Sequence, residues 1–243
     1  MWEFSLACSN KHKDILEYIK NCFCADLPDC MLTSYGDKHF VYLLFASDES
    51  ISNICKTKIK RCVSTYIVDV YKYNYFMTKI VNTKNLINQA YVKALTLYDV
   101  DTDIALINSL LDFDNSLHID SFIAFKLNDL ERMWQELCDL ITSNINYLNH
   151  DMKIDVMRQF ISTFDSPIAT LKIIIEDDGF ALYKLTNDCN PVKLKDNAED
   201  IDIVNYTLLL NPKHIEIYGN INNGFSMINL LKSLYEDKVQ VIK

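Results

Sequence analysis

The first 80 residues combine strand-like and helix-like patterns of apolar positions. Every second residue from Trp2 to Cys8 is apolar, which is the period of a strand with one buried face. A helical stripe follows from Asp14 to Cys24, and two apolar runs then flank Gly36-Asp37, where glycine would allow the positive φ of a tight hairpin turn. A second helical stripe runs from Ile51 to Val70. The order predicts a β-α-β-β-α unit over residues 1–82, with helices packed on a small antiparallel sheet.

The middle of the chain, residues 83–165, has helical periodicity throughout. Two stripes between Lys84 and Leu111 predict two helices joined near the sequence "DVDTD". The strongest stripe repeats at three and four residues and comprises Leu127, Leu130, Trp134, Leu137, Ile141, Ile145 and Leu148. Packing within the chain explains this stripe more readily than a coiled-coil partner does, although both fit the spacing. A further helix ends before Ser166-Pro167, because the residue ahead of proline avoids helical geometry.

The last segment, residues 166–243, predicts a small α/β domain of order β-β-α-β-α-β. A hairpin turns at Asp177-Asp178-Gly179, and Asn197 is placed to cap the helix that ends before Pro212. A strand over 213–218, a helix over 225–236 and a strand over 238–242 complete the order. The whole chain is therefore expected to be an α+β protein with three consecutive parts.

The strand in "LLLNPKHIEIYG" carries polar residues on one face. His214, Glu216 and Tyr218 alternate with two isoleucines, so they should share the open side of a half-buried strand. A solvated strand face is the ordinary explanation of this pattern. The functional alternative is a protein-binding surface built from Lys213, His214 and Tyr218.

Composition and charge narrow the classes of function. The chain has 49% hydrophobic and 23% charged residues, which is typical of a folded globular protein. A formal charge of -9 argues against binding to nucleic-acid phosphates, and the run "KTKIKR" (56–61) would scatter its charges around a helix. The N-terminal sequence does not resemble a secretory signal, and apolar stretches are too short to cross a membrane. A cytoplasmic location is the expectation.

Candidate metal and catalytic motifs have simpler structural explanations. We expect the eight cysteines to be reduced, with Cys55 and Cys62 acting as packing residues. Cys22, Cys24 and Cys30 with His39 could suggest zinc, but the one-residue gap points the first two to different sides of a helix. The acidic groups Glu176–Gly179 and Glu199–Asp202 suit a turn and a helix start. The sequence has neither a phosphate-binding glycine loop nor a catalytic signature, so we predict no catalytic residue, metal or cofactor, although a Cys-His or Ser-His-Asp site assembled from distant positions stays open.

Three blocks resemble the YtxC-like family of sporulation proteins from endospore-forming bacteria. They are "IDSFIAFKLNDL" (119–130), "VMRQFISTF" (156–164) and "LLLNPKHIEIYG" (208–219) followed by "LLKSLYEDKVQV" (230–241). The resemblance implies a link to sporulation, with no agreed activity to carry over. Together with the acidic charge and the missing catalytic motifs, it leads to the hypothesis of a non-enzymatic protein that acts through protein contacts. The chain has Lys126 where the family favours Arg, and Tyr218 where it tends to carry His. The resulting candidate binding residues are Lys126, Asp129, Lys213, His214 and Tyr218. The alternative is a hydrolase or nuclease-like enzyme with an active site in the C-terminal domain.

Overall fold

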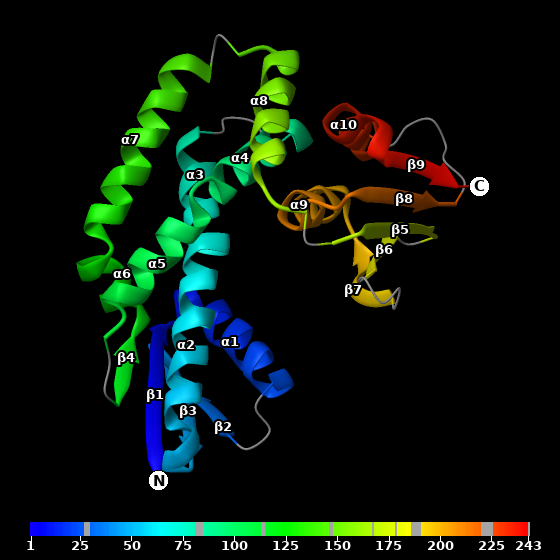
Figure 1. Cartoon of the computed structure of the whole chain (residues 1–243). Helices are drawn as coiled ribbons and strands as arrows, with labels where there is room; N and C mark the ends of the chain where they lie inside the picture. Colours follow the sequence, from blue (N-terminus) through cyan, green and yellow to red (C-terminus); the bar gives the residue numbers. More distant parts are fainter. Residues whose placement is uncertain are drawn as a thin grey trace. The chain divides into compact units, whose positions relative to one another are not determined.

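The computed structural model describes residues 1–26, 30–80, 85–112, 115–145, 148–166, 168–177, 179–185, 191–219 and 226–242. The chain forms two compact units, which are not the three consecutive parts expected from the sequence. The first unit comprises residues 1–75 and 99–139, and the second comprises residues 76–98 and 140–243. The residues of the helical middle are therefore shared between the two units. Both units mix helices with a sheet, which confirms the α+β class (Figure 1).

The first unit is built on a four-stranded sheet. In chain order its elements are β1 (Trp2–Ser9), α1 (Lys13–Asp26), β2 (Met31–Gly36), β3 (Phe40–Ser47), α2 (Ser52–Tyr66), a π-helical turn (Ile67–Lys72), the start of α3 (Tyr73–Ile80), α5 (Val100–Leu110), β4 (Ser116–His118), α6 (Ile119–Lys126) and most of α7 (Asn128–Ile145). The strand order is β2-β3-β1-β4, with β4 parallel to β1 and the other neighbours antiparallel. The predicted β-α-β-β-α order is present, and β4 adds a strand that the sequence did not reveal.

One face of this sheet forms the core of the unit. Trp2, Phe4, Leu6 and Cys8 are buried as predicted, and α1 packs against β1 and β3 on this side. Ala7, on the opposite face, is also buried.

The β2–β3 turn does not use the backbone geometry expected at Gly36. Gly36 does not have a positive φ, in contrast to Gly179 and Gly219. The Asp37 carboxylate instead accepts hydrogen bonds from the backbone N–H groups of His39 and Phe40 at 2.7 and 2.8 Å. The Asp37 side chain therefore stabilises the turn by binding its backbone, which is the role that the sequence analysis gave to Gly36.

A buried ion pair lies where the π-helical turn meets α5 and α7. Lys72 Nζ lies 2.6 Å from Asp103 Oδ2, and both side chains are almost completely buried. The indole N–H of Trp134 donates to the same carboxylate oxygen at 3.3 Å. The hydroxyl groups of Tyr71 and Tyr75 donate to Glu131 and Gln135 of α7. Polar contacts thus fix α7 on this part of the unit together with apolar packing.

The buried stripe of α7 differs from the prediction at Leu137 and at Leu148, which is half-buried beyond the helix end at Ile145. The side chain of Ile145 lies outside the described residues. Leu127, Leu130, Trp134 and Ile141 are buried, but Cys138 takes the place expected for Leu137, which is half-buried. Both residues fit a spacing of three or four from Trp134, so the periodicity alone did not decide between them.

The second unit carries a five-stranded sheet of order β7-β6-β5-β8-β9. Its elements are the end of α3, α4 (Leu86–Leu97), the end of α7, α8 (His150–Thr163), β5 (Thr170–Glu176), β6 (Gly179–Leu185), β7 (Pro191–Ala198), α9 (Asp200–Leu210), β8 (His214–Tyr218), α10 (Ser226–Tyr235) and β9 (Val239–Ile242). Strands β5, β8 and β9 are parallel, and the meander β5-β6-β7 is antiparallel. Right-handed crossovers that advance in one direction put α9 and α10 on the same face of the sheet, and these two helices contact each other.

Two features of this unit correct the sequence analysis. The β7 strand was missed, so the order is β-β-β-α-β-α-β. Asn197 lies in β7 with a φ of 47° and does not cap the helix. The cap is Glu199, which forms a capping box with Asp202.

Candidate functional site

The first unit has one sheet face whose side chains are exposed or half-buried except for Ala7, and we call it the open face. Strand registers place on it Glu3, Ser5, Ala7 and Ser9 of β1, Met31, Thr33 and Tyr35 of β2, Phe40, Tyr42, Leu44 and Ala46 of β3, and Ser116 and His118 of β4. Glu3 is the only one of these residues that carries a formal charge at neutral pH with histidine neutral. Met31 and Tyr35 are 76% and 53% exposed. Large apolar groups gathered on an exposed face are typical of a binding surface.

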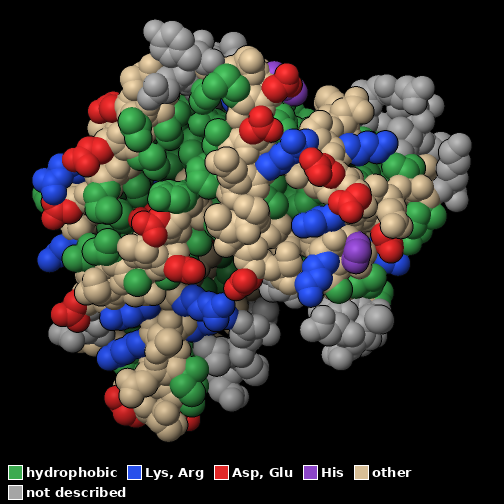
Figure 2. Space-filling view, turned by 45° about the horizontal axis from the view of Figure 1, so that its top comes forward, with side chains coloured by type: hydrophobic (Ala, Val, Ile, Leu, Met, Phe, Trp, Pro, Cys, Tyr) green, Lys and Arg blue, Asp and Glu red, His purple; other side chains and the backbone are tan. Residues whose placement is uncertain are grey.

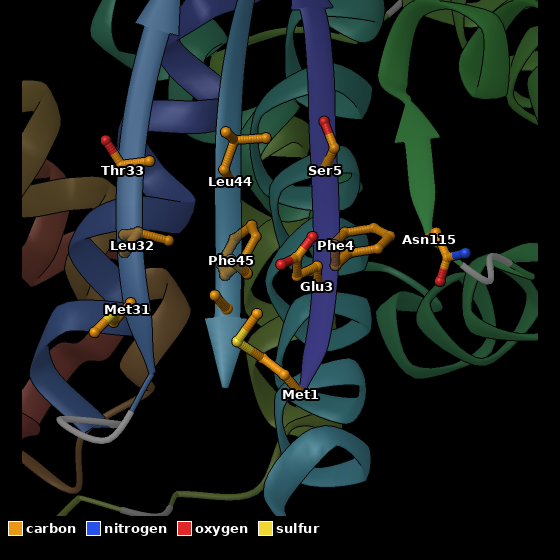
Figure 3. A pocket seen from close by; sticks show the side chains of 11 residues that line it. Met1, Glu3, Phe4, Ser5, Met31, Leu32, Thr33, Leu44, Phe45 and Asn115 are labelled. Atoms are coloured by element: carbon orange, nitrogen blue, oxygen red, sulfur yellow. The ribbon is translucent and has the colours of Figure 1, made fainter. Parts of the chain in front are cut away.

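One end of the open face is hollow. A depression of about 1010 Å³ is lined by residues that include Met1, Glu3, Met31, Thr33 and Leu44. Figure 3 shows Thr33, Leu44 and Ser5 in a row across β2, β3 and β1, with helices behind the sheet. The depression is therefore formed by the sheet surface itself, on the side opposite the helices.

The other end of the open face carries a row of rings. Tyr35 and Tyr42 stack with centroids 4.6 Å apart and planes within 8°. Phe40 lies 6.4 Å from Tyr42 and makes an edge contact at 5.3 Å with His118. These cross-strand ring contacts hold the aromatic groups in a fixed arrangement.

A polar junction centred on Asp120 borders this aromatic row. The Asp120 carboxylate accepts hydrogen bonds from the Ser9 backbone N–H at 2.7 Å and from the Ser9 hydroxyl at 2.8 Å. His12 Nδ1 lies 2.7 Å from the same carboxylate, and His118 Nδ1 lies 3.8 Å from it. Partial burial favours a higher pKa for Asp120, but the bonds from Ser9 and His12 outweigh it and the pKa is lowered. The carboxylate is thus held ionised as the link between β1 and α6.

The junction has part of a catalytic arrangement but not its alignment. A carboxylate bound to histidine Nδ1 is how hydrolytic triads orient their base. Here the Ser9 hydroxyl donates to Asp120 instead of lying against the histidine. The neighbouring thiol, Cys8, is buried, and desolvation followed by repulsion from Asp120 and Asp14 raises its pKa to about 12. Neither group is poised as a nucleophile, so the junction serves to fix the end of the open face.

The predicted residues Lys126 and Asp129 lie at the junction of α6 and α7. Both are exposed, and Asp129 pairs with Arg132 one turn along its helix at 3.2 Å. The flanking Leu127 and Leu130 are buried. Lys126 and Asp129 therefore lie in solvent where α6 meets α7.

The three other predicted residues lie on or beside β8. Ile215 and Ile217 are fully buried, and His214, Glu216 and Tyr218 alternate with them on the open side, so the predicted alternation is confirmed. Lys213 and His214 are exposed. The Tyr218 hydroxyl donates to Glu216 at 2.8 Å, and the Lys172 ammonium lies 3.6 Å from Glu216 and 5.2 Å from the Tyr218 ring. Tyr218 thus belongs to a cross-strand polar cluster, and His214 lies at the other end of the strand.

The cysteines that the structure describes are free thiols. Cys8, Cys30, Cys55, Cys62 and Cys138 are buried, and Cys22 is half-buried; the side chain of Cys24 and all of Cys189 lie outside the described residues. Within the described ranges, no group of three or more His, Cys, Asp or Glu side chains is arranged to hold a metal ion. His39 is exposed at the β2–β3 turn, whereas Cys30 is buried.

Smaller depressions lie on the described part of the second unit. One, of about 410 Å³, is lined by residues of α4, α10 and the start of α8. Another, of about 250 Å³, is lined by residues that include His150, Asp155 and Arg158. Arg158 bonds to the Ser233 carbonyl and pairs with Asp155 and Glu236. These contacts join α8 to α10 and the turn after it, and the charged groups pair with each other, as is typical of packed helices.

Charges are interspersed over the visible surface. On the side shown in Figure 2, Lys and Arg side chains lie among Asp and Glu side chains. The basic run Lys56–Arg61 lies in α2, where Ile59 is buried and Arg61 is exposed. Among the helices of the described ranges, none combines the length and the apolar character needed to cross a bilayer.

Comparisons of the chain with family models, curated proteins and solved structures find no match. The resemblance to the YtxC-like family therefore stays a prediction.

Sequence reasoning missed both parts of the candidate site. The open face depends on strand registers, which place β4 beside β1 although more than 100 residues separate them. Asp120 meets Ser9 and His12 across 111 and 108 positions. The available signal was the group "HID" (118–120) at the start of an apolar helix, where His118 is the N-cap and Asp120 lies in the first turn.

Proposed function

We propose that this chain is a cytoplasmic protein of spore formation that acts by binding a partner protein through the open face. The observation that carries the proposal is the open face, which presents large apolar and aromatic side chains beside a depression at one end and a ring row at the other. The link to sporulation rests on the resemblance of residues 119–130, 156–164, 208–219 and 230–241, and the location carries over from the sequence analysis.

The chemistry of the open face indicates what the partner presents. Leu44, Tyr42 and Met31 offer apolar contact area, and aromatic and methionine side chains are enriched where proteins bind one another. Glu3 lies beside the depression on a chain of net charge -9. The complementary surface is therefore apolar and carries a lysine or arginine that faces Glu3.

The test replaces Leu44 with aspartate in an endospore-forming host whose own copy is deleted. Leu44 is half-buried on the sheet surface, so Leu44→Asp should fold while placing an unpaired carboxylate in the contact. We expect heat-resistant spores to fall to the level of the deletion strain. Ile54→Asp is the matched control, because Ile54 is 55% exposed on α2 and should sporulate normally.

A photo-cross-linking residue at position 44 then identifies the bound protein. Titration of that purified protein against Leu44→Asp should show affinity reduced by about tenfold or more, since desolvating a carboxylate costs more than ~1.4 kcal/mol. A folded Leu44→Asp variant with normal spore counts and unchanged affinity would refute the open face as the binding surface. Normal heat-resistant spore counts in the deletion strain would refute the role in sporulation.

A further inference from the structure

Strand β2 forms an uncharged, exposed edge of the first sheet. Within the described part of the chain, β2 pairs only with β3. Its sequence, MLTSYG, contains no charged residue and no proline. Every one of its residues except Leu32 is exposed. A strand edge offers backbone N–H and C=O groups to any extended segment that can reach it.

The other described sheet edges have features that discourage such pairing. Strand β7 has Pro191, Lys193 and Lys195, and its register with β6 is irregular. Strands β4 and β9 are three and four residues long. Proline, lysine, irregular register and shortness are the usual protections of an edge. Strand β2 has six residues and none of these protections.

The direction of the free backbone groups follows from the β2–β3 turn. The Asp37 N–H donates to the Phe40 carbonyl, so residues 37 and 40 form a hydrogen-bonded pair. Such pairs alternate along an antiparallel ladder, which turns the backbone groups of Leu32 and Ser34 away from β3. The bond from Asn10 N–H to the His39 carbonyl gives the same alternation for the β1–β3 ladder.

We propose that β2 pairs in antiparallel fashion with β2 of a second copy of this chain, about a two-fold axis at Thr33. In this register Leu32 of each copy forms a hydrogen-bonded pair with Ser34 of the other. The side chains of the open face then meet as Thr33 with Thr33 and, on both sides, Met31 with Tyr35. Thr–Thr and sulfur–aromatic contacts are favourable cross-strand pairs. The strand is therefore complementary to itself.

Charge also favours a second copy at this edge. Each chain carries a net charge of -9, so two copies repel each other at most surfaces. Because β2 carries no charged residue, two chains can approach each other there without bringing like charges together. Pairing there joins the two sheets into one of eight strands, with both open faces on the same side. The inference is independent of the proposed function, since it uses the strand edge and not the occupant of the open face.

The first experiment measures molecular mass against protein concentration by sedimentation equilibrium. Because one strand pair buries less area than a standard stable interface, we expect a reversible shift from monomer to dimer as concentration rises. Ser34→Pro removes an outward N–H without removing a β2–β3 bond and should stay monomeric with an unchanged circular dichroism spectrum. Thr33→Lys, which sets two like charges at the axis, should also stay monomeric. Ser116→Lys, on the opposite edge strand, should dimerise like the wild type.

The second experiment tests the register by oxidation. Thr33→Cys places two thiols face to face at the axis, whereas Ser34→Cys faces Leu32 of the other copy. We expect an intermolecular disulfide to form faster in Thr33→Cys. A wild-type protein that is monomeric at all concentrations, assembles beyond two copies, or dimerises unchanged with Ser34→Pro and Thr33→Lys would overturn the proposal. Faster cross-linking of Ser34→Cys would overturn the register.

Discussion

At the scale of single residues, Asp120 is the group that ties distant parts of the first unit together. Three hydrogen-bond donors converge on one carboxylate: the backbone N–H and the hydroxyl of Ser9, and His12. Their combined effect lowers the pKa of Asp120 below its ordinary value of 3.8. A carboxylate whose pKa is lowered by folding stabilises the folded state above its unfolded pKa and ceases to do so as pH falls through its folded pKa.

Replacing this carboxylate should lower stability in a pH-dependent manner. Asp120→Asn removes the charged acceptor, and we expect the free energy of unfolding at pH 7 to drop by about 1–3 kcal/mol. The difference from the wild type should shrink as pH falls below 4, because the wild-type carboxyl then becomes protonated too. Urea unfolding from pH 7 to pH 2.5 measures this. A difference that stays constant over that range would show that the charge of Asp120 is not what stabilises the junction.

The thiols offer a second prediction at this scale. Desolvation is the main cause that raises the pKa of Cys8 and of Cys30 to about 12. At pH 8 only about one in ten thousand of such thiols is ionised, and the thiolate is the reactive form. In the folded protein, iodoacetamide should label the half-buried Cys22 well before Cys8 and Cys30, with mass spectrometry as the readout. Equal labelling rates would mean that the core around Cys8 opens on the time scale of the reaction.

Among the elements, the helical run from α2 through the π-helical turn to α3 is distinguished by its buried Lys72. The ion pair with Asp103 lies beside Trp134 in a nearly dry environment. A buried pair contributes little net stability over apolar residues of the same shape, but removing one partner leaves a buried charge unpaired. A π-helical turn at such a site re-aims the side chains that follow it.

Mutation of the pair should show this asymmetry. We expect Lys72→Met to cost about 3–5 kcal/mol, because Asp103 keeps its charge without its cation. The double variant Lys72→Met with Asp103→Leu should recover most of that loss. Urea unfolding of the wild type and of both variants provides the comparison. Equal stability of the single and double variants would mean that the loss comes from packing around position 72 and not from an unpaired charge.

The elements that sequence analysis missed are those without a repeating apolar pattern. Strand β4 has three residues, and its place is set by its parallel pairing with Ser5–Ala7. Strand β7 is an edge strand with two lysines and has no regularly buried face. Its sequence therefore shows no alternation of apolar and polar residues. By contrast, α5 and β8 bury one regular stripe or face each and were predicted correctly. Helix α4 was also predicted, although residues 90–97 are buried on all sides. Periodicity detects burial within an element, and it carries no information on which distant element lies beside it.

For the whole molecule, the same limit affected the domain organisation and the candidate site. The open face and the Asp120 junction are both completed by residues near 118, which pack beside β1. The predicted candidates Lys213, His214 and Tyr218 depended only on alternation within one strand, so their arrangement could be predicted. Their role as a binding surface stays a prediction. The three consecutive parts expected from sequence order differ from the two units for the same reason, since each unit combines segments from separate stretches of chain.

The second unit gives the last prediction, which concerns the part of the chain needed to fold its sheet. Helix α4 packs against α8 and α9, and α10 contacts α8. The buried Asn211 side chain, next to α9, donates to the carbonyls of Ile161 and Phe164 in and after α8. A fragment of residues 166–243 lacks α4 and α8, so the sides of α9 and α10 that contact these helices would be exposed to water.

We therefore expect this fragment to show poor dispersion in its ¹H–¹⁵N correlation spectrum and no cooperative thermal transition. A permuted chain, in which residues 140–243 are followed by a flexible linker and residues 76–98, restores both helices and should unfold cooperatively. Within it, Asn211→Ala removes the side-chain donor of the Phe164 carbonyl and leaves the Ile161 carbonyl with only the Phe164 N–H. The melting temperature should therefore fall, since an unsatisfied buried polar group costs about 1–3 kcal/mol. A well-folded 166–243 fragment would show that the sheet needs neither α4 nor α8, and that the boundary predicted near residue 166 separates an independent domain.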